Sequence, residues 1–397
     1  MNNYKILASL RLLKSTINLF VSSFFVMYFL EISNNNIPKL GLYYILVYLT
    51  VFVTIFLCRN LCKSKKRINL LRIGIVLDFV YFLLILLLNE KLVDYMYLMG
   101  VIYGLEEGFY YSVYNNFESN GISNQERAKF TGIYTCLKSV ISIMIPLIFG
   151  TVITSSGFGS CTIIVLILVI LQIICSFLFK DVNLVDNNKV DLKEYKNIMS
   201  KNEIIKNIYK ICFFNGFIFS GAFKSIVVVY IIKIVNTNFN LGIFTSIFAI
   251  VASVIGYLFA NVIPKSKYSS IFKYLIALTI FGLVLIMIDA NFITVVLFNF
   301  FQTLSSTLCG LIIENSQIDL ANYDEIKNKY KVEYFIYMEK NIFIGRFFGY
   351  IMYIVIGLSQ SMLLTNLVLI GFIILILMLS YYSIKLINKI FISNEME

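Results

Sequence analysis

Ionisable side chains inside long apolar stretches are the residues of this sequence with the clearest chemical potential. Glu106 and Glu107 stand side by side near the middle of the apolar stretch 95–117. An ionised side chain at the centre of a bilayer costs at least about 2.5–3.5 kcal/mol on insertion scales, so it needs a partner, a watery cavity or a role. A carboxylate that binds and releases a proton inside a cavity can couple a proton gradient to another process. Glu106 and Glu107 are therefore the predicted proton-coupling pair, with Glu107 as the member that faces the cavity.

Six further charged residues lie in the apolar stretches and bring the total to four acidic and four basic side chains, which suggests mutual neutralisation; they are Asp78, Glu339, Lys138, Lys224, Lys340 and Arg346. A structural ion pair with Lys138 is the alternative to proton coupling at Glu107. Lys224 and Arg346 either bind an anionic substrate, which Arg can hold bidentately, or form internal salt bridges. Glu339 and Lys340 are predicted to be structural. Asp78 is predicted to pair with the basic loop next to its own stretch.

The composition shows what kind of element must position these residues. Of 397 residues, 59% are apolar and 14% are charged, and the mean hydropathy is +0.84. Soluble globular proteins have about 45–50% apolar and about 25% charged residues. These values argue against a soluble enzyme, a disordered chain or a nucleic-acid-binding domain. The absence of His removes the commonest general base and metal ligand. Seven Cys without metal-binding spacing are read as packing residues, so neither a metal nor a cofactor is expected.

Membrane-spanning helices need about 20 mostly apolar residues. The sequence contains twelve such stretches, at 15–33, 41–60, 69–88, 95–117, 131–153, 161–180, 209–234, 241–263, 271–289, 292–314, 334–357 and 362–383. We therefore predict an all-α integral membrane protein with twelve transmembrane helices, the first of them a retained helix rather than a cleaved signal peptide.

The distribution of Lys and Arg predicts the orientation. With the N-terminus inside, 26 of these 33 residues fall in inner segments, three in outer segments and four within spans. Cytoplasmic loops carry the excess of Lys and Arg, so both termini are predicted to be cytoplasmic. This placement also explains the net charge of +11 without a nucleic-acid partner.

Short identities recur at a nearly constant offset close to half of the chain. Lys63-Ser64-Lys65 recurs as Lys265-Ser266-Lys267, and Tyr28 and Lys138 recur as Tyr230 and Lys340, each with a shift of 202. Leu40-Gly41 recurs as Leu241-Gly242 with a shift of 201. Internal repeats of this kind are typical of secondary transporters. We predict two pseudo-symmetric six-helix bundles at 1–180 and 209–397, joined by a cytoplasmic linker at 181–208.

Two parallel six-helix repeats, with both termini inside and a long central loop, resemble the major facilitator superfamily. The family's loop between spans 2 and 3 carries Gly, Asp and basic residues; the segment from Arg59 to Arg67 keeps the basic part and lacks Gly and Asp. The G-P-x-x-G-G element of the family's exporters is reduced here to Pro146 and Gly150. The resemblance implies the superfamily fold, with helices 1, 4, 7 and 10 around a central cavity.

Polar stripes on these four helices supply the candidate substrate site. At 100° per residue, Asn299, Gln302 and Ser306 fall on one face of span 10. Gly104, Glu107 and Tyr111 share a face of span 4, and the two stripes coincide under the shift of 202. The predicted substrate and cavity residues are Asn18, Ser22, Gly104, Glu107, Tyr111, Ser220, Lys224, Asn299, Gln302, Ser306 and Arg346. The glycine ladder Gly100, Gly104 and Gly108 is also explained by tight helix packing.

These observations predict a transporter rather than an enzyme, and no nucleotide-binding motif is present. The expected protein moves a small solute across a bacterial cytoplasmic membrane by alternating access, is coupled to protons, and works as a monomer. Export is slightly favoured over uptake, on Pro146 and Gly150 alone. The alternatives are a lipid or peptide exporter on the same scaffold and, from another class, a membrane-embedded enzyme or sensor.

Overall fold

The computed structural model describes residues 3–64, 67–120, 124–180, 190–218, 222–223, 225–226, 237–262, 267–321, 326, 329–359 and 362–388. Within these ranges the secondary structure is helical and no strand is present. The chain divides into two compact units. The first unit contains residues 1–191, 235–246 and 327–336, and the second contains 192–234, 247–326 and 337–397.

The first unit is built from long apolar helices. Its first span is continuous: α1 (Asn3–Leu19) runs through a π-helical segment (Phe20–Phe25) into α2 (Val26–Ile32). The other helices are α3 (Ile37–Cys58), α4 (Arg67–Leu88), α5 (Met96–Asn120) and α6 (Asn124–Leu178). The side chain of Asn36 caps α3 by accepting a hydrogen bond from the backbone N–H of Lys39.

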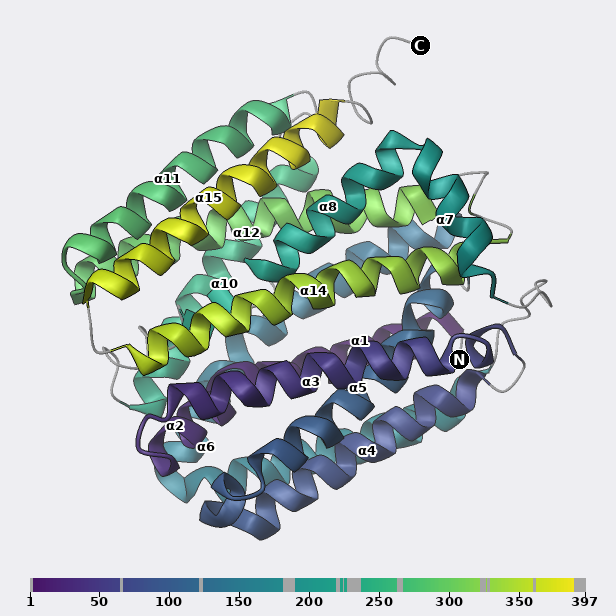
Figure 1. The fold of residues 1–397 in the computed structure, drawn as a ribbon. Helices are drawn as coiled ribbons and strands as arrows, with labels where there is room; N and C mark the ends of the chain where they lie inside the picture. The colour runs from purple at the N-terminus through teal and green to yellow at the C-terminus, as the bar shows by residue number, and fades with distance from the viewer. Residues whose placement is uncertain are drawn as a thin grey trace. The chain divides into compact units, whose positions relative to one another are not determined.

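Helix α5 occupies a central place in this unit, since it packs against both α3 and α4, while α1 packs against α6 (Figure 1). Helix α6 contains two of the predicted spans. The break between them is at Gly157, whose φ of 84° is a backbone conformation that favours glycine. The predicted turn between 153 and 161 is therefore a single glycine kink.

The second unit contains α7 (Leu192–Lys201), α8 (Glu203–Phe217), α11 (Tyr268–Ile288), α12 (Phe292–Ala321) and α15 (Met362–Ile387). It also contains most of α10 (Asn238–Asn261) and α14 (Lys331–Leu358), whose first turns group with the first unit. Helix α11 packs against α12 and α15, and α15 also packs against α8.

Nine helical segments of the described part are long and apolar enough to cross a membrane. Ten of the twelve predicted spans fall on them, because the segment Leu137–Leu178 holds two. The span predicted at 95–117 corresponds to α5, whose interior carries Glu106 and Glu107. The span predicted at 209–234 lies partly outside the described residues.

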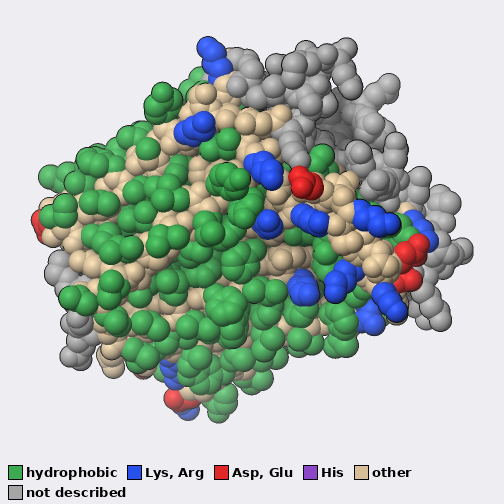
Figure 2. Space-filling view, turned by 45° about the horizontal axis from the view of Figure 1, so that its top comes forward, with side chains coloured by type: hydrophobic (Ala, Val, Ile, Leu, Met, Phe, Trp, Pro, Cys, Tyr) green, Lys and Arg blue, Asp and Glu red, His purple; other side chains and the backbone are tan. Residues whose placement is uncertain are grey.

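The surface of these helices suits a hydrocarbon environment. Large apolar side chains are strongly exposed on both units, including Leu57 (69%) and Leu87 (70%) in the first and Ile288 (71%) in the second. Figure 2 shows hydrophobic side chains over most of the face in view, with Lys and Arg gathered in one part of it. Apolar patches of this extent on a soluble monomer would be rare. The prediction of an all-helical, multi-pass membrane protein is confirmed.

Candidate functional site

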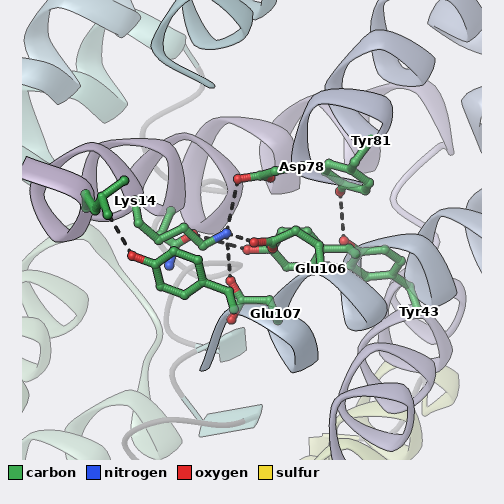
Figure 3. A network of polar contacts seen from close by, with 10 residues as sticks. Lys14, Tyr43, Asp78, Tyr81, Glu106 and Glu107 are labelled. Carbon is green, nitrogen blue, oxygen red and sulfur yellow. Dashed lines mark hydrogen bonds and ion pairs between the residues drawn. The ribbon is translucent and has the colours of Figure 1, made fainter. Parts of the chain in front are cut away.

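A buried cluster of charges lies where α1, α4 and α5 meet in the first unit. The ammonium nitrogen Nζ of Lys14 is 3.2 Å from Oδ2 of Asp78, 2.7 Å from Oε2 of Glu106 and 3.0 Å from Oε1 of Glu107 (Figure 3). One lysine from α1 therefore faces one carboxylate from α4 and two from α5. We call these four residues the Lys14 cluster.

The three carboxylates of the cluster are not equivalent. Lys14, Asp78 and Glu106 are at most 2% exposed, whereas Glu107 is 17% exposed. Lys14 donates hydrogen bonds to Asp78 and Glu106. Glu107 Oε1 lies within ion-pair distance of Lys14 but has no hydrogen-bond donor among the described residues. Glu107 is therefore the member of the cluster that is held least firmly and reaches solvent most readily.

Tyrosine side chains enclose the cluster. The Lys14 ammonium lies 5.5 Å from the ring centre of Tyr103 and 5.7 Å from that of Tyr110, which is within cation–π range. Next to Tyr103, the hydroxyl groups of Tyr43 and Tyr81 are 2.8 Å apart (Figure 3). The Tyr103 hydroxyl also donates to the side-chain oxygen of Asn18 at 3.4 Å. These rings surround the charges with polarisable, mostly buried surface.

The local sequence explains how the three helices bring the charges together. Leu10, Lys14 and Ile17 share the buried face of α1, so Lys14 points into the unit rather than toward its surface. On α4, Gly74 stands one turn before Asp78. A Cβ at Gly74 would lie 3.0 Å from the Glu106 carbonyl oxygen and 2.9 Å from the Tyr110 nitrogen, so glycine allows α4 and α5 to approach closely.

The cluster corrects two expectations from the sequence. The ammonium that faces Glu106 and Glu107 belongs to Lys14, whereas Lys138 is exposed and lies 5.7 Å from the ring of Tyr134. Asp78 pairs with Lys14 rather than with the basic loop. The physical reason is helix length: α1 begins at Asn3, so Lys14 lies well inside the first span instead of flanking it.

The basic loop has its own acidic partner within the first unit. Lys63 donates to the Glu333 carboxylate at 3.0 Å and to the Lys329 carbonyl at 3.1 Å, and Glu333 also accepts from the Asp191 backbone N–H at 2.9 Å. Both charged side chains are nearly buried, at 6% and 1% exposure. This pair was not anticipated, because residue 333 lies at the edge of a predicted span, where charge is ordinary.

Other predicted site residues of the first unit lie near the cluster or serve helix packing. Asn18 meets Tyr103 as described, Ser22 donates to the Leu19 carbonyl of its own helix, and Tyr111 follows Tyr110 on α5. A Cβ on Gly104 would lie 2.5 Å from the Val47 carbonyl oxygen, so this glycine is required where α5 packs on α3. A role for Gly104 in a cavity wall stays a prediction.

The predicted site residues of the second unit that the structure describes lie on α12 and α14. Asn299 and Gln302 are each 7% exposed, and Ser306 donates to the Thr303 carbonyl of its own helix. Arg346 and Glu339 are half-buried, and Lys340 is exposed near the ring of Tyr337. Ser220 and Lys224 lie outside the described residues, so their roles stay predictions.

No group of three or more Cys, Asp or Glu that could hold a metal ion occurs in the part of the chain that the structure describes. In the loop after α3, burial raises the pKa of the Cys62 thiol to about 12, so the thiol is protonated at neutral pH. In the Lys14 cluster the single ammonium of Lys14 is the cation that faces the three carboxylates.

Comparison of the sequence with known proteins gives a family match and a bacterial relative. Residues 8–317 match the sequence model described as Major Facilitator Superfamily. Over 299 residues the chain is 23% identical to the uncharacterized protein YqgE of Bacillus subtilis (strain 168), covering 74% of this chain and 69% of that protein.

Solved structures of transporters share the fold. The human organic anion transporter MFSD10 (TETRAN) has a TM-score of 0.61 at 12% identity, over 95% of this chain and 99% of its own. A bacterial homologue of the iron transporter ferroportin in an inward-facing state has a TM-score of 0.61 at 12% identity, over 97% and 98%. An auto inhibited peptide transporter of the POT family has a TM-score of 0.68 at 9% identity, over 96% and 97%. At these identities the likeness concerns the fold alone.

Proposed function

The chain belongs to the Major Facilitator Superfamily, so it is a secondary transporter rather than an enzyme. We propose that a proton gradient drives transport and that the coupled proton binds at Glu107. The family resemblance predicted from the sequence, and with it the fold class, is confirmed. The solute, the coupling ion and the direction belong to the proposal.

The asymmetry of the Lys14 cluster is the observation that carries the proton step. Asp78 and Glu106 are fully buried and hydrogen-bonded to Lys14, while Glu107 is 17% exposed and lacks such a bond. A coupling carboxylate must exchange its proton with water and must also change its interactions when the protein changes state. Of the three carboxylates, Glu107 meets both requirements best.

The ion pair with Lys14 links the protonation of Glu107 to the contact between α1 and α5. When Glu107 is ionised it adds to the attraction on the Lys14 ammonium, and when it is protonated Lys14 is held by Asp78 and Glu106 alone. A change of charge at this point alters the electrostatic link between α1 and α5. The helices concerned are the first and fourth spans, which the family uses to line its cavity, so proton binding would bias one conformation over the other.

The remaining proposals are the substrate, direction and location. We infer a small solute, transport across a bacterial cytoplasmic membrane with both termini in the cytoplasm, and a monomer. Export is favoured by the Pro146–Gly150 element. Gly150 packs closely on Gly242 of α10, since a Cβ at position 150 would lie 3.3 Å from the Gly242 Cα. Packing of this kind is compatible with the shortened exporter element.

The test uses purified protein in liposomes with a pH gradient and a trapped pH-sensitive dye. Panels of small cations, carboxylates and dipeptides are added, and proton movement that depends on a solute identifies substrates. We expect Glu107→Gln to abolish solute-dependent proton flux, while the matched control Glu90→Gln, at an exposed carboxylate in the short 3-10 helix after α4, retains it. Proton-driven flux that is undiminished in folded Glu107→Gln protein would rule out the proposed role.

A purely structural role for Glu107 has a different signature. In that case Glu107→Gln lowers both the yield of folded protein and its thermal stability. A folded Glu107→Gln protein that still binds substrate, with its proton dependence lost, distinguishes the carrier from the structural partner.

A further inference from the structure

The Lys14 cluster holds more negative than positive charge. Its single ammonium faces three carboxylates at 2.7–3.2 Å, so full ionisation would leave two uncompensated negative charges. The other groups around the cluster are phenols: Tyr43 from α3, Tyr81 from α4, and Tyr103, Tyr110 and Tyr111 from α5. Arg11, one turn before Lys14 on α1, stacks on Tyr134 at 4.2 Å. Protonation of Glu107 alone would still leave one excess charge.

Carboxylate oxygen atoms without a hydrogen-bond donor show where the excess negative charge lies. Oδ1 of Asp78 and Oε1 of Glu106 are buried, and neither has a hydrogen-bond donor among the described residues. Both residues are 0% exposed. A buried carboxylate oxygen without a donor or counter-charge is costly, and in practice such a group binds a proton instead. A proton on either oxygen supplies a donor and removes one charge.

We propose that Asp78 and Glu106 share one resident proton that stays bound while the proton on Glu107 exchanges. One of the two carboxyl groups is then a neutral acid, and the other is the carboxylate that balances Lys14. The cluster alternates between a net charge of −1 and neutrality as Glu107 loses and gains its proton. Without the resident proton the same exchange would run between −2 and −1, which is far less favourable in a buried site.

This inference goes beyond proton coupling, because it concerns two carboxyl groups that take no part in the exchange. It also assigns Asp78 and Lys14 a positioning role. Their ion pair fixes Glu106, and the shared proton allows two acidic side chains to lie against one lysine. The inference stands on burial, distances and charge, and it can fail while Glu107 still couples transport, or succeed while Glu107 does not.

The test is infrared difference spectroscopy of purified protein in H2O and D2O, which detects the carbonyl stretch of protonated carboxylic acids. The background is Glu107→Gln, so the exchanging carboxyl group cannot contribute. Spectra are recorded at about pH 8, far above the ordinary carboxyl pKa range of about 3.9–4.3. We expect a band corresponding to one acid per protein, unchanged by the control Glu90→Gln.

Two further changes assign the band. Adding Asp78→Asn or Glu106→Gln to the Glu107→Gln background removes one carboxylate, so the remaining one pairs with Lys14 and the band should disappear in both variants. Each replacement keeps an oxygen that can accept from Lys14, so both proteins should fold. Absence of the band from Glu107→Gln protein, its persistence in the double variants, or failure of both variants to fold would each overturn the proposal.

Discussion

Equivalent helices pack against each other in the two units, but the side chains between them differ in charge. In the first unit α4 packs on α5, and in the second α11 packs on α12. Under the shift of 202, Asp78, Glu106 and Glu107 correspond to Ile280, Leu308 and Cys309. The charges of one pair are apolar in the other. Equivalent helix pairs are thus present in both units, while the side chains at equivalent positions differ in charge.

Between α11 and α12, the polar contacts join uncharged side chains whose hydroxyl groups all have hydrogen-bond partners. The hydroxyl groups of Thr279 and Ser305 lie 2.5 Å apart, both fully buried, and Ser305 also donates to the Leu275 carbonyl at 2.8 Å. This arrangement has no excess charge to be balanced by a proton. We therefore expect proton dependence to respond to changes in the first unit and stability alone to respond to matched changes in the second.

Removing the lysine of the cluster should have the largest effect. Lys14→Met leaves buried carboxylates without a cation, which we expect to lower the free energy of unfolding by about 3–5 kcal/mol. Thermal unfolding of purified protein in detergent measures the change. The control Lys138→Met removes an exposed lysine and should stay within about 0.5 kcal/mol of the parent. Equal stability of the two variants would contradict the cluster geometry.

Placing a charge at the equivalent point of the second unit should have the next largest effect. Leu308 is 0% exposed and corresponds to Glu106. Leu308→Glu has no matching lysine, since residue 216, the counterpart of Lys14, is glycine. We expect a loss of about 2.5–3.5 kcal/mol, against less than about 1.5 kcal/mol for Leu308→Met. If Leu308→Glu is tolerated as well as Leu308→Met, the two halves are more alike than their residues indicate.

A pair of equivalent glycines tests packing rather than charge. A Cβ on Gly108 would lie 2.6 Å from the Cβ of Thr54 on α3, whereas a Cβ on Gly310 meets no described atom within 4 Å. Gly108→Ala should cost about 1–3 kcal/mol through overpacking. Gly310→Ala should be neutral or stabilising by about 0.5–1 kcal/mol, because alanine is the better helix former. Chemical denaturation of both variants checks the sign of the difference.

The smallest effect is expected at the neutral pair of the second unit. Thr279→Val keeps the side-chain shape but removes one hydroxyl, and Ser305 retains its bond to Leu275. The expected cost is about 1 kcal/mol, with unchanged pH dependence of transport. Thr151→Val, at an exposed threonine that bonds only within its own turn among the described contacts, is the control. A change in proton coupling for Thr279→Val would break the division between the halves.

The helices were predictable from the sequence because twenty-residue apolar runs have few alternatives in a membrane. The carboxylates at 78, 106 and 107 were also predictable as unusual, since each interrupts such a run. Their partner was not predictable, because Lys14 lies one residue before the span predicted at 15–33, where a basic side chain is ordinary. Leu10 and Ile17, which share its helix face, are the signal that could have placed it inside.

The ion-pair partners on different helices were also beyond prediction from the sequence. Lys138 and Glu107 lie on consecutive predicted spans, which favoured them as partners, but sequence proximity does not determine which faces of two helices meet. The Lys63–Glu333 pair joins residues far apart in the chain. Only the folded backbone brings such residues together, so their ionic contacts could not be derived from the pattern of one sequence.

The depth of the Lys14 cluster has an electrical consequence. Lys14 is eleven residues beyond the start of α1, about 16 Å at 1.5 Å per residue, so a proton that reaches Glu107 from either side crosses part of the membrane voltage. A full crossing changes the energy of one elementary charge by about 2.3 kcal/mol per 100 mV. Occupancy of Glu107 would then depend on voltage as well as on proton concentration, and an energised membrane would load it from one side even at equal pH.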